Sequence, residues 1–198
     1  MAYVELVEKD MAPPEVLAIY AAGESTYGQV LQTWKAIAHN PAVLQAYLPY
    51  VRSIFGPGPL DERTKQLVAI RVCYLNQCRY SLSHRIASAT KQGIAHDDLI
   101  AVADPASGRF TEAELAAMTF AEELTVGPAN TPYADSPQVV SKETLDAVKA
   151  SYSDSAINDL AITVGLWNLL TRYHRVMDFD LDMPPPPPQL DPALDNEQ

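Results

Sequence analysis

The sequence predicts an all-α protein, a bundle of roughly eight helices joined by short loops. Apolar residues recur at helical spacing in successive segments, and the interior of the chain shows no strand-like alternation. Proline and glycine clusters, such as GPGP at 56–59, interrupt this pattern at intervals of helix length. With 198 residues and 47% hydrophobic content, the chain has enough apolar side chains for one core.

The predicted helices of the first half carry their own start and stop signals. After an N-terminal arm, 1–12, Pro13 and Pro14 open a helix, because proline is tolerated in the first turn. Gly23 is expected to end that helix, and Asn40 to cap the helix that begins at the next proline. In chain order, the predicted helices cover about 15–22, 29–39, 41–55, 61–75, 78–92, 96–104, 111–124, 142–150 and 154–179.

Threonine and serine caps mark the helices of the second half. Thr111 and Glu114 have the spacing of a capping box, in which each side chain bonds to the other residue's backbone. Ser141 and Ser153 each precede a helix as caps. The stretch 127–140, rich in Pro, Asn, Ser and Asp, is predicted to be a loop.

The C-terminal tail, 183–198, contains five consecutive prolines, which force polyproline II and cannot join a helix. Alone, such a tail would be disordered. If it is ordered, a contact must hold it, most simply with a neighbouring subunit. The predicted organisation is therefore an arm at 1–12, one helical domain at 13–182 and the tail.

Composition and charge exclude several classes of function. The chain has no apolar run of about 18 residues, so no membrane span is predicted. The N-terminus lacks the basic and apolar segments of a secretory signal. A net charge of −11 and a pI near 4.6 argue against nucleic acid or an anionic membrane as partner, since both need a positive patch. We expect a soluble cytoplasmic protein.

The cysteines and histidines predict neither a metal site nor a disulfide. Cys73 and Cys78 are five positions apart, so on an unbroken helix they would point roughly 140° apart, which disfavours a bridge. His39, His96 and His174 have no metal-binding spacing with one another. No glycine-rich phosphate loop is present either. The sequence therefore predicts no metal and no cofactor.

The stretch 60–94 holds both cysteines and the densest mix of buried and reactive side chains. Asp61 is expected to cap its first helix, and Asn76-Gln77 to separate that helix from a second one. Cys78 then stands at the N-terminus of the second helix. Free N–H groups and the helix dipole at this place favour a thiolate over a thiol.

The segment QLVAIRVCYLNQCRYSLSHRIASATKQGI, residues 66–94, resembles the alkylhydroperoxidase D / carboxymuconolactone decarboxylase family. The positions that fall on the family's pattern are Asn76, Cys78, Tyr80, His84 and Gly93. The resemblance extends more weakly over 13–182. It implies an AhpD-like helical fold, a small-molecule substrate and a homo-oligomer, a trimer or a hexamer.

Three departures separate this chain from the redox members that it resembles. Gln66 stands where they have a glutamate, Ser81 where they have the second, reactive cysteine, and Arg85 where many have a histidine. A dithiol–disulfide cycle needs two sulfurs whose Cα atoms lie within about 6 Å. Only Cys78 remains in the motif, so we expect no disulfide-cycling peroxidase activity.

His84 is the residue best suited to acid–base chemistry near neutral pH, and the resemblance places it at the family's site. Ser81, one turn earlier, can contact it at i, i+3 spacing, but no nucleophile elbow or orienting carboxylate supports a hydrolase. Arg85 can clamp a carboxylate or an enolate. The predicted catalytic residues are His84, Cys78 and Ser81, and the predicted substrate-binding residues are Arg85, Gln66, Tyr80 and Arg71.

Three hypotheses about function remain open at this point. The first is a non-redox enzyme of lyase, decarboxylase or isomerase type, acting on a small organic acid, lactone or carbonyl compound; His84 transfers protons while Arg85 and Gln66 hold negative charge. The second is a single-thiol, alkylhydroperoxidase-like antioxidant protein that uses Cys78. The third is a non-catalytic oligomeric binding protein. The thiolate fraction of Cys78 separates the second hypothesis from the others.

Overall fold

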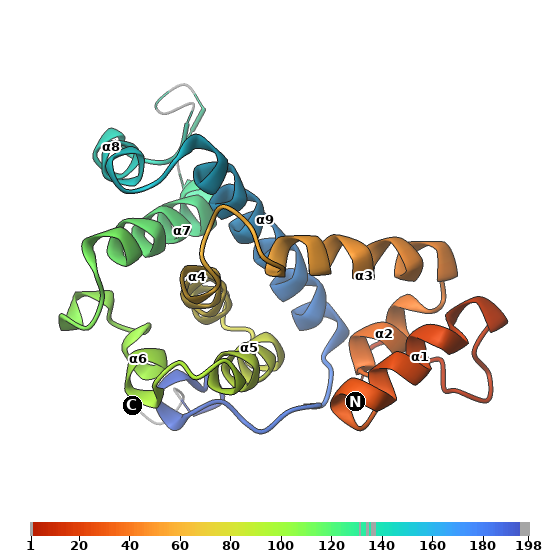
Figure 1. The fold of residues 1–198 in the computed structure, drawn as a ribbon. Coiled ribbons are helices and arrows are strands. Elements are labelled where there is room, and N and C mark those ends of the chain that lie inside the picture. The colour runs from red at the N-terminus through yellow and green to blue at the C-terminus, as the bar shows by residue number, and fades with distance from the viewer. Residues whose placement is uncertain (1, 131, 134, 136–137, 195–198) are drawn as a thin grey trace.

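The computed structural model describes residues 2–130, 132–133, 135 and 138–194, and all regular secondary structure in this part of the chain is helical (Figure 1). The all-α class predicted from the sequence is confirmed. The α-helices are α1 (Pro14–Tyr27), α2 (Gln32–Ile37), α3 (Pro41–Phe55), α4 (Glu62–Leu75), α5 (Arg79–Lys91), α6 (His96–Ala101), α7 (Glu112–Asn130), α8 (Lys142–Ser151) and α9 (Asp154–Met177). Two short 3-10 helices are η1 (Pro105–Ser107) and η2 (Pro188–Leu190).

The helix caps form where the sequence predicts them. The carboxylate of Asp61 accepts from the backbone N–H of Thr64 at 2.8 Å. In the capping box, Glu114 accepts from the N–H of Thr111 at 2.8 Å, and the Thr111 hydroxyl accepts from the N–H of Glu114 at 3.2 Å. The other side-chain caps are Asn40, Ser141 and Ser153. Each cap satisfies a backbone donor that the first turn of a helix leaves free.

The predicted end of the first helix is wrong. α1 runs through Gly23 and ends at Tyr27, where Gly28 takes the left-handed conformation with a φ of 76°. Gly23 has a different reason to be glycine: a Cβ there would lie 2.7 Å from the ring of Trp34. This glycine therefore allows α1 and α2 to approach closely.

The predicted loop 127–140 begins too early, because α7 continues to Asn130. A Cβ at Gly127 would lie 2.5 Å from Cγ1 of Val139, so this turn of α7 is packed against the returning chain. Part of the predicted loop, at 131, 134 and 136–137, lies outside the described residues.

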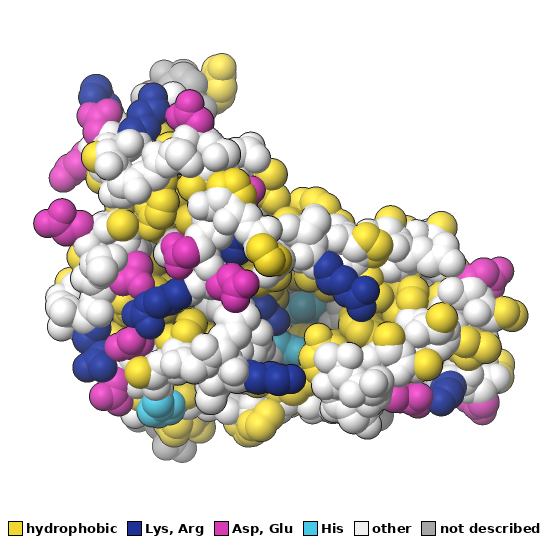
Figure 2. Space-filling view, in the orientation of Figure 1, with side chains coloured by type: hydrophobic (Ala, Val, Ile, Leu, Met, Phe, Trp, Pro, Cys, Tyr) yellow, Lys and Arg dark blue, Asp and Glu magenta, His cyan; other side chains and the backbone are white. Residues whose placement is uncertain are grey.

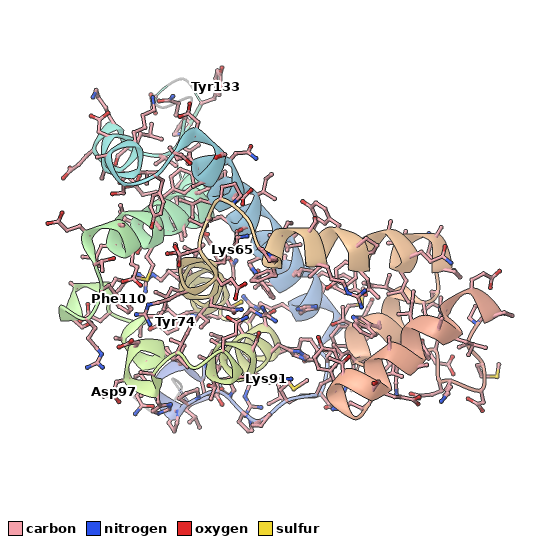
Figure 3. All side chains as sticks on the ribbon, viewed as in Figure 1. Lys65, Tyr74, Lys91, Asp97, Phe110 and Tyr133 are labelled. Atoms are coloured by element: carbon pink, nitrogen blue, oxygen red, sulfur yellow. The ribbon has the colours of Figure 1, made fainter. Side chains whose placement is uncertain are left out.

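α4 is the centre of the main core, and residues 64–73 on it are all buried. α5, α7 and α9 surround it (Figure 1). This buried stretch of α4 includes Lys65, which is only 1% exposed (Figure 3). Its ammonium donates to the carbonyl of Gly56 at 3.0 Å and lies 3.7 Å from the carboxylate of Asp159. This lysine ties the GPGP break to α9, so the entry to α4 is fixed.

The N-terminal helices α1–α3 project to one side of this bundle (Figure 1). They have their own apolar cluster, which includes Val16, Tyr20, Trp34 and Leu44. The N-terminal arm is pinned in two places, since Tyr3 N–H donates to the carbonyl of Met177 at 2.8 Å and Val7 N–H to that of Lys35 at 3.2 Å. The arrangement leaves a hollow between the N-terminal helices and the main bundle.

The C-terminal tail is held by contacts with its own chain as far as residue 194, whereas the simplest expectation was a neighbouring subunit. Leu190 is buried in the main core. The Asp191 carboxylate pairs with Nε of Arg79, the first residue of α5, at 2.8 Å. Residues 195–198 lie outside the described residues. No helix of the described chain is long and apolar enough to cross a membrane.

Candidate active site

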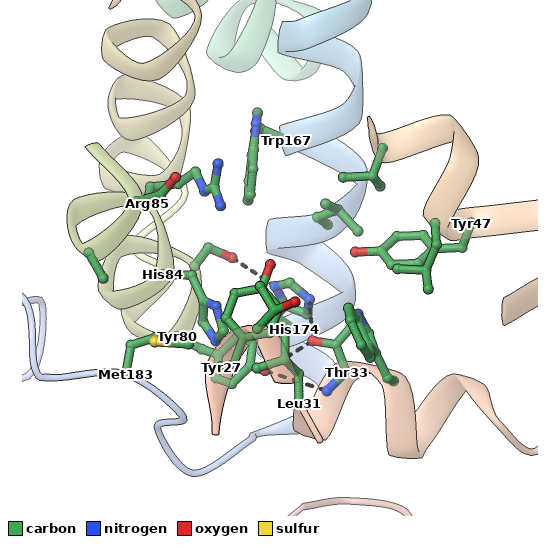
Figure 4. Close-up of a pocket in the computed structure, with 18 of the residues that line it drawn as sticks. Tyr27, Leu31, Thr33, Tyr47, Tyr80, His84, Arg85, Trp167, His174 and Met183 are labelled. Carbon is green, nitrogen blue, oxygen red and sulfur yellow. Dashed lines mark hydrogen bonds between the residues drawn. The ribbon is translucent and has the colours of Figure 1, made fainter. Parts of the chain in front are cut away.

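A cavity of about 550 Å³ lies between α5, α9 and the N-terminal helices (Figure 4). Figure 2 shows histidine side chains deep in this hollow and basic side chains on its rim. The lining residues include Tyr27, Thr33, Tyr47, Arg52, Tyr80, Ser81, His84, Arg85, Lys91, Trp167, His174 and Met183. A pocket of this size, with apolar walls and a few polar groups, is typical of a small-molecule site.

One face of α5 forms the wall of the cavity, with Tyr80, Ser81, His84, Arg85 and Ser88 all lining it. Their spacing places them on one side of a helix. α5 starts at this point because Gln77, with a φ of 50°, turns the chain after α4. The separation of the two helices, predicted from Asn76-Gln77, thus aims these side chains at the cavity. Their place at the cavity is observed, while their roles stay predictions.

Arg85 brings an unpaired positive charge to the cavity. Its guanidinium lies 4.7 Å from the ring centre of Trp167 and 4.9 Å from that of Phe55. Within the described part of the chain it has no hydrogen bond or ion pair, and its Nε is buried without a partner. Burial lowers the pKa of Arg85. A half-buried cation that only aromatic rings contact is available to bind an anion.

His84 lies against a buried carboxylate that the sequence analysis did not identify. Its Nε2 is 3.4 Å from Oδ2 of Asp182, and only 13% and 3% of the two side chains are exposed. This separation is too long for a good hydrogen bond, but it is short enough for an ion pair when the imidazole is protonated. The same oxygen accepts from the hydroxyl of Tyr80 and from the N–H of Gln32, the latter at 3.0 Å.

The i, i+3 spacing would allow Ser81 to pair with His84, but the Ser81 hydroxyl pairs with His174 on α9. Ser81 Oγ is 2.8 Å from Nδ1 of His174, and Nε2 of His174 is 3.0 Å from Oγ1 of Thr33. Burial, with a smaller effect from His84, lowers the pKa of His174 to about 3. His174 is therefore neutral at physiological pH.

Tyr80 connects these two histidine environments. The Thr33 hydroxyl donates to the Tyr80 oxygen at 3.1 Å, and Tyr80 donates to Asp182. Burial, and next the charge of Asp182, raise the pKa of Tyr80. Its ring centre also lies 4.6 Å from that of His84 and 4.8 Å from that of His174. Tyr80 therefore stays protonated and fixes both imidazoles by contact.

Cys78 does not have the reactive environment that its helix position predicted. The thiol is 1% exposed, it does not line the cavity, and its sulfur donates to Ser81 Oγ at 3.1 Å. Burial raises the pKa of Cys78, against the smaller opposing effect of the hydrogen bonds. Desolvation of the thiolate thus outweighs the helix dipole. Cys73 is buried in the main core, and both cysteines are free.

Two predicted substrate-binding residues do not line the cavity. Gln66 lies behind α5, where its amide donates to Ser88 at 3.4 Å. Arg71 faces the other side of α4; it donates to the carbonyls of Val102 and Ala103, and its Nη2 is 2.5 Å from Glu122. Arg71 therefore binds other parts of the protein and is not placed to bind a substrate in the cavity. The resemblance to the family brought Gln66 into the prediction, but neither side chain faces the cavity.

Sequence comparison finds a family that part of this chain resembles. Residues 41–123 match the carboxymuconolactone decarboxylase family. "Uncharacterized protein 4 in cox locus" of Paracoccus denitrificans is 31% identical over 55 residues, which cover 28% of this chain and 50% of that protein. "Uncharacterized protein YnjA" of Escherichia coli strain K12 is 26% identical over 121 residues, 61% of this chain and 62% of that protein. The chain thus matches about half to three fifths of the length of these relatives.

Solved structures show the same fold. An uncharacterized peroxidase-related protein from Silicibacter sp. TM1040 superposes with a TM-score of 0.77 at 18% identity, over 93% of this chain and 91% of that one. A cysteine-to-alanine variant of the debrominase Bmp8, in complex with 2,3,4-tribromopyrrole, superposes with a TM-score of 0.76 at 20% identity, over 91% and 94%. These superpositions show that the chain is a helical protein with an AhpD-like fold. Over residues 41–123 the chain is similar to the carboxymuconolactone decarboxylase family.

Proposed function

We propose that this protein binds a small organic anion in the cavity and catalyses proton transfer on it, in lyase- or isomerase-type chemistry without a redox step. One observation carries this proposal. His84 and Arg85 are neighbours on α5 and line the same cavity; the first has the Asp182 carboxylate behind it, and the second has no counter-ion among the described residues.

The charges around the cavity favour an anionic ligand. Arg52, Arg85 and Lys91 line it, and none of its lining residues is an aspartate or a glutamate. This is a local reversal in a chain whose net charge is −11. A bound carboxylate would gain the charge-assisted hydrogen bonds that Arg85 does not make with any described residue. The aromatic rings beside it suit a planar or conjugated ligand, and Bmp8 binds a brominated pyrrole on the same fold.

His84 has the surroundings of a general base. Its Nε2 faces Asp182, so the proton of the neutral ring belongs there and Nδ1 keeps its lone pair. When a C–H bond of the substrate breaks, the proton goes to Nδ1, and Asp182 stabilises the imidazolium. The electron pair moves to the carbonyl oxygen as an enolate, which Arg85 stabilises. The reverse step, from imidazolium to carbon, completes an isomerisation or follows the loss of CO₂.

The two alternatives have less support. A single-thiol mechanism needs an exposed thiolate, whereas Cys78 is buried, does not line the cavity and has a raised pKa. A binding protein would use Arg85 without needing a base. The Asp182–His84 pair favours catalysis over binding alone.

Hydrogen–deuterium exchange of a panel of small keto acids and lactone acids tests the proposal. In D₂O, the wild type is expected to exchange the acidic C–H of at least one compound, as followed by proton NMR. His84→Gln should slow this exchange by about 10²–10⁴-fold, the usual contribution of a general base. His39→Gln changes an exposed histidine outside the cavity and serves as the matched control.

The outcomes separate the three hypotheses. Background exchange in the wild type with compounds that bind would mean a binding protein. Exchange that survives in His84→Gln would move the base to another residue.

We also propose that the chain forms a homo-oligomer, a trimer or a hexamer. On α9, Ile162, Leu169 and Val176 recur at seven-residue spacing, and 62% and 63% of the latter two are exposed. An apolar stripe of this kind on one helix face favours contact with another subunit. Light scattering at micromolar concentration that shows a 21.7 kDa monomer would contradict it.

A further inference from the structure

Tyr47 lines the cavity from α3, on the side opposite α5 (Figure 4). Its side chain reaches from α3 toward the middle of the cavity, and the hydroxyl is at the end that points inward. In the sequence, Tyr47 falls among the apolar residues Leu44, Leu48 and Val51, so its position indicates a packing role. The structure assigns that role to the ring but not to the hydroxyl.

The ring of Tyr47 packs against two apolar clusters, the main core and the cluster of the N-terminal helices. α3 itself joins these clusters, because Ile54 near its end belongs to the first and Leu44 near its start belongs to the second. The ring is thus held from both sides, and this packing sets the direction of the hydroxyl. A phenylalanine would fill the same space, so packing alone does not require a tyrosine here.

The hydroxyl of Tyr47 has no hydrogen bond to any described residue. Two other tyrosines with buried rings differ from it: Tyr20 donates to the carbonyl of Val7 at 2.8 Å, and Tyr80 donates to Asp182. Burial raises the pKa of Tyr47, against a smaller opposite effect from the charge of Arg85. The phenol therefore stays protonated near neutral pH and is a donor without an acceptor. Such a group costs free energy when it loses water.

Arg85 lies across the cavity from Tyr47 (Figure 4). Its guanidinium contacts the rings of Phe55 and Trp167, which accept none of its hydrogen bonds. Because the charge of Arg85 affects the pKa of Tyr47, the two groups lie within electrostatic reach of each other. Two donors on separate helices, one charged and one neutral, therefore line one cavity. A carboxylate has two oxygens with about four lone pairs, enough to accept from both donors.

We propose that Tyr47 is a further ligand-binding residue of this cavity: its phenol donates a hydrogen bond to the anionic group that Arg85 holds, so that the bound anion joins α3 to α5. The proposal rests on the proposed function for the anion at Arg85. It gives the hydroxyl of Tyr47 the acceptor that the described part of the protein does not supply.

Calorimetric titration with benzoate tests Tyr47 by a change that removes only the hydroxyl. Tyr47→Phe is expected to weaken benzoate binding about 10-fold, because it removes a hydrogen bond to a charged group. Tyr50→Phe is the matched control. It makes the same change on the same helix, at a residue that is 52% exposed and outside the cavity lining, and it should bind benzoate as the wild type does.

The melting temperature of the ligand-free variants separates binding from folding. Since the Tyr47 hydroxyl has no partner among the described residues, Tyr47→Phe should melt no lower than the wild type. Its loss of benzoate binding then cannot be attributed to a damaged fold. A melting temperature that falls markedly in Tyr47→Phe but not in Tyr50→Phe would show that the hydroxyl has a structural partner, which would overturn the proposal.

Carbon-13 NMR of the tyrosine Cζ atoms detects the contact directly. The Tyr47 resonance is the one that Tyr47→Phe lacks. In the wild type, benzoate should move it toward the position of an ionised phenol, because a hydrogen bond to an anion draws the proton away from the oxygen. In Arg85→Met, the same concentration of benzoate should move it much less. A Tyr47 resonance that does not respond in the wild type, at a concentration that saturates binding, would overturn the proposal.

The binding data also distinguish this proposal from the proposed function on which it rests. Benzoate binding that weakens in Arg85→Met but not in Tyr47→Phe would overturn the role of Tyr47 and leave the anion site at Arg85 in place. A wild type that does not bind benzoate would refute the anion site itself, and with it the role of Tyr47.

Discussion

The two arginines beside the main core, Arg71 on α4 and Arg85 on α5, have opposite surroundings. Arg71 donates to two backbone carbonyls at 2.9 and 3.0 Å and pairs with Glu122. Arg85 contacts two aromatic rings and, within the described chain, no acceptor. Both guanidiniums lose water, and Nε of each is buried without a partner, but only Arg71 regains hydrogen bonds through its other nitrogens.

This difference supports a structural role for Arg71 and, under the proposed function, a ligand-binding role for Arg85. Removing a buried charge that has several partners lowers stability, because those partners lose their contacts. A charge left without partners costs stability while it is present, and burial lowers the pKa of Arg85 accordingly. Under the proposed function, an anion in the cavity that Arg85 lines would supply the missing partner.

Removing each arginine should have opposite effects on stability and on binding. Arg71→Met should lower the free energy of unfolding by about 2–3 kcal/mol, since Glu122 and two carbonyls lose a donor. Arg85→Met should change it by less than about 1 kcal/mol, in either direction. Urea denaturation followed by circular dichroism measures both.

Binding of benzoate completes this test. Arg85→Met should weaken it at least about 10-fold, as expected for a lost charge-assisted contact, while folded Arg71→Met should bind as the wild type does. Equal losses of stability in the two variants would show that Arg85 has structural partners after all.

The sequence predicts the local features of this molecule well. The caps at Asp61, Thr111 and Ser141, and the start of α3 at Pro41, involve residues within one turn of each other. Their interactions depend on spacing alone. Gly23 was misread because its role, contact with Trp34, is tertiary.

The sequence predicted only the part of the candidate site that lies on one helix, α5. Ser81, His84 and Arg85 share a face of α5, so their spacing brought them together. Thr33 and Asp182 come from segments about 50 and 100 positions away, and no local pattern marks them. His174 had a signal in the sequence, a histidine on the apolar stripe of the last helix, but that position also fits a packing role.

The C-terminal segment allows a similar comparison. Asp182 lies against His84 at the cavity, whereas Asp191 pairs with Arg79. Truncation after Met183 keeps Asp182 but removes Leu190 from the core and Asp191 from Arg79. We expect a loss of about 2 kcal/mol, mostly from the burial of one leucine. Leu190→Ala should give much of this loss and Asp191→Asn little, because Arg79 is 42% exposed. An unchanged melting temperature would mean that the tail contributes nothing.

His174 should make stability fall in acid. In the unfolded chain a histidine binds a proton below about pH 6.5, whereas folded His174 stays neutral down to about pH 3. Between these values the unfolded state binds the extra proton, so the free energy of unfolding decreases as the pH falls, by at most about 1.4 kcal/mol per pH unit. His174→Gln, which cannot titrate, should show a shallower slope by about one proton. Identical slopes would mean that His174 is already protonated in the folded protein.

The smallest expected effect is the rate at which the protein turns over peroxide. An attacking thiolate and a second thiol are both needed to reduce a hydroperoxide by the dithiol route, and Ser81 occupies the place of one sulfur. Cys78 is buried with a raised pKa, and Cys73 lies in the core with a pKa raised still further by burial. Turnover of hydrogen peroxide with a dithiol reductant should therefore stay near background in the wild type and in Cys78→Ser alike.

A double change tests whether only the redox groups are missing. Gln66→Glu with Ser81→Cys would place a carboxylate behind α5 and a second sulfur beside Cys78, in a wall that already lines the cavity. A gain of peroxidase activity in this variant would show that the scaffold is intact. A robust rate in the wild type that disappears in Cys78→Ser would instead establish the single-thiol hypothesis, because no other described cysteine is near enough to the cavity to replace it.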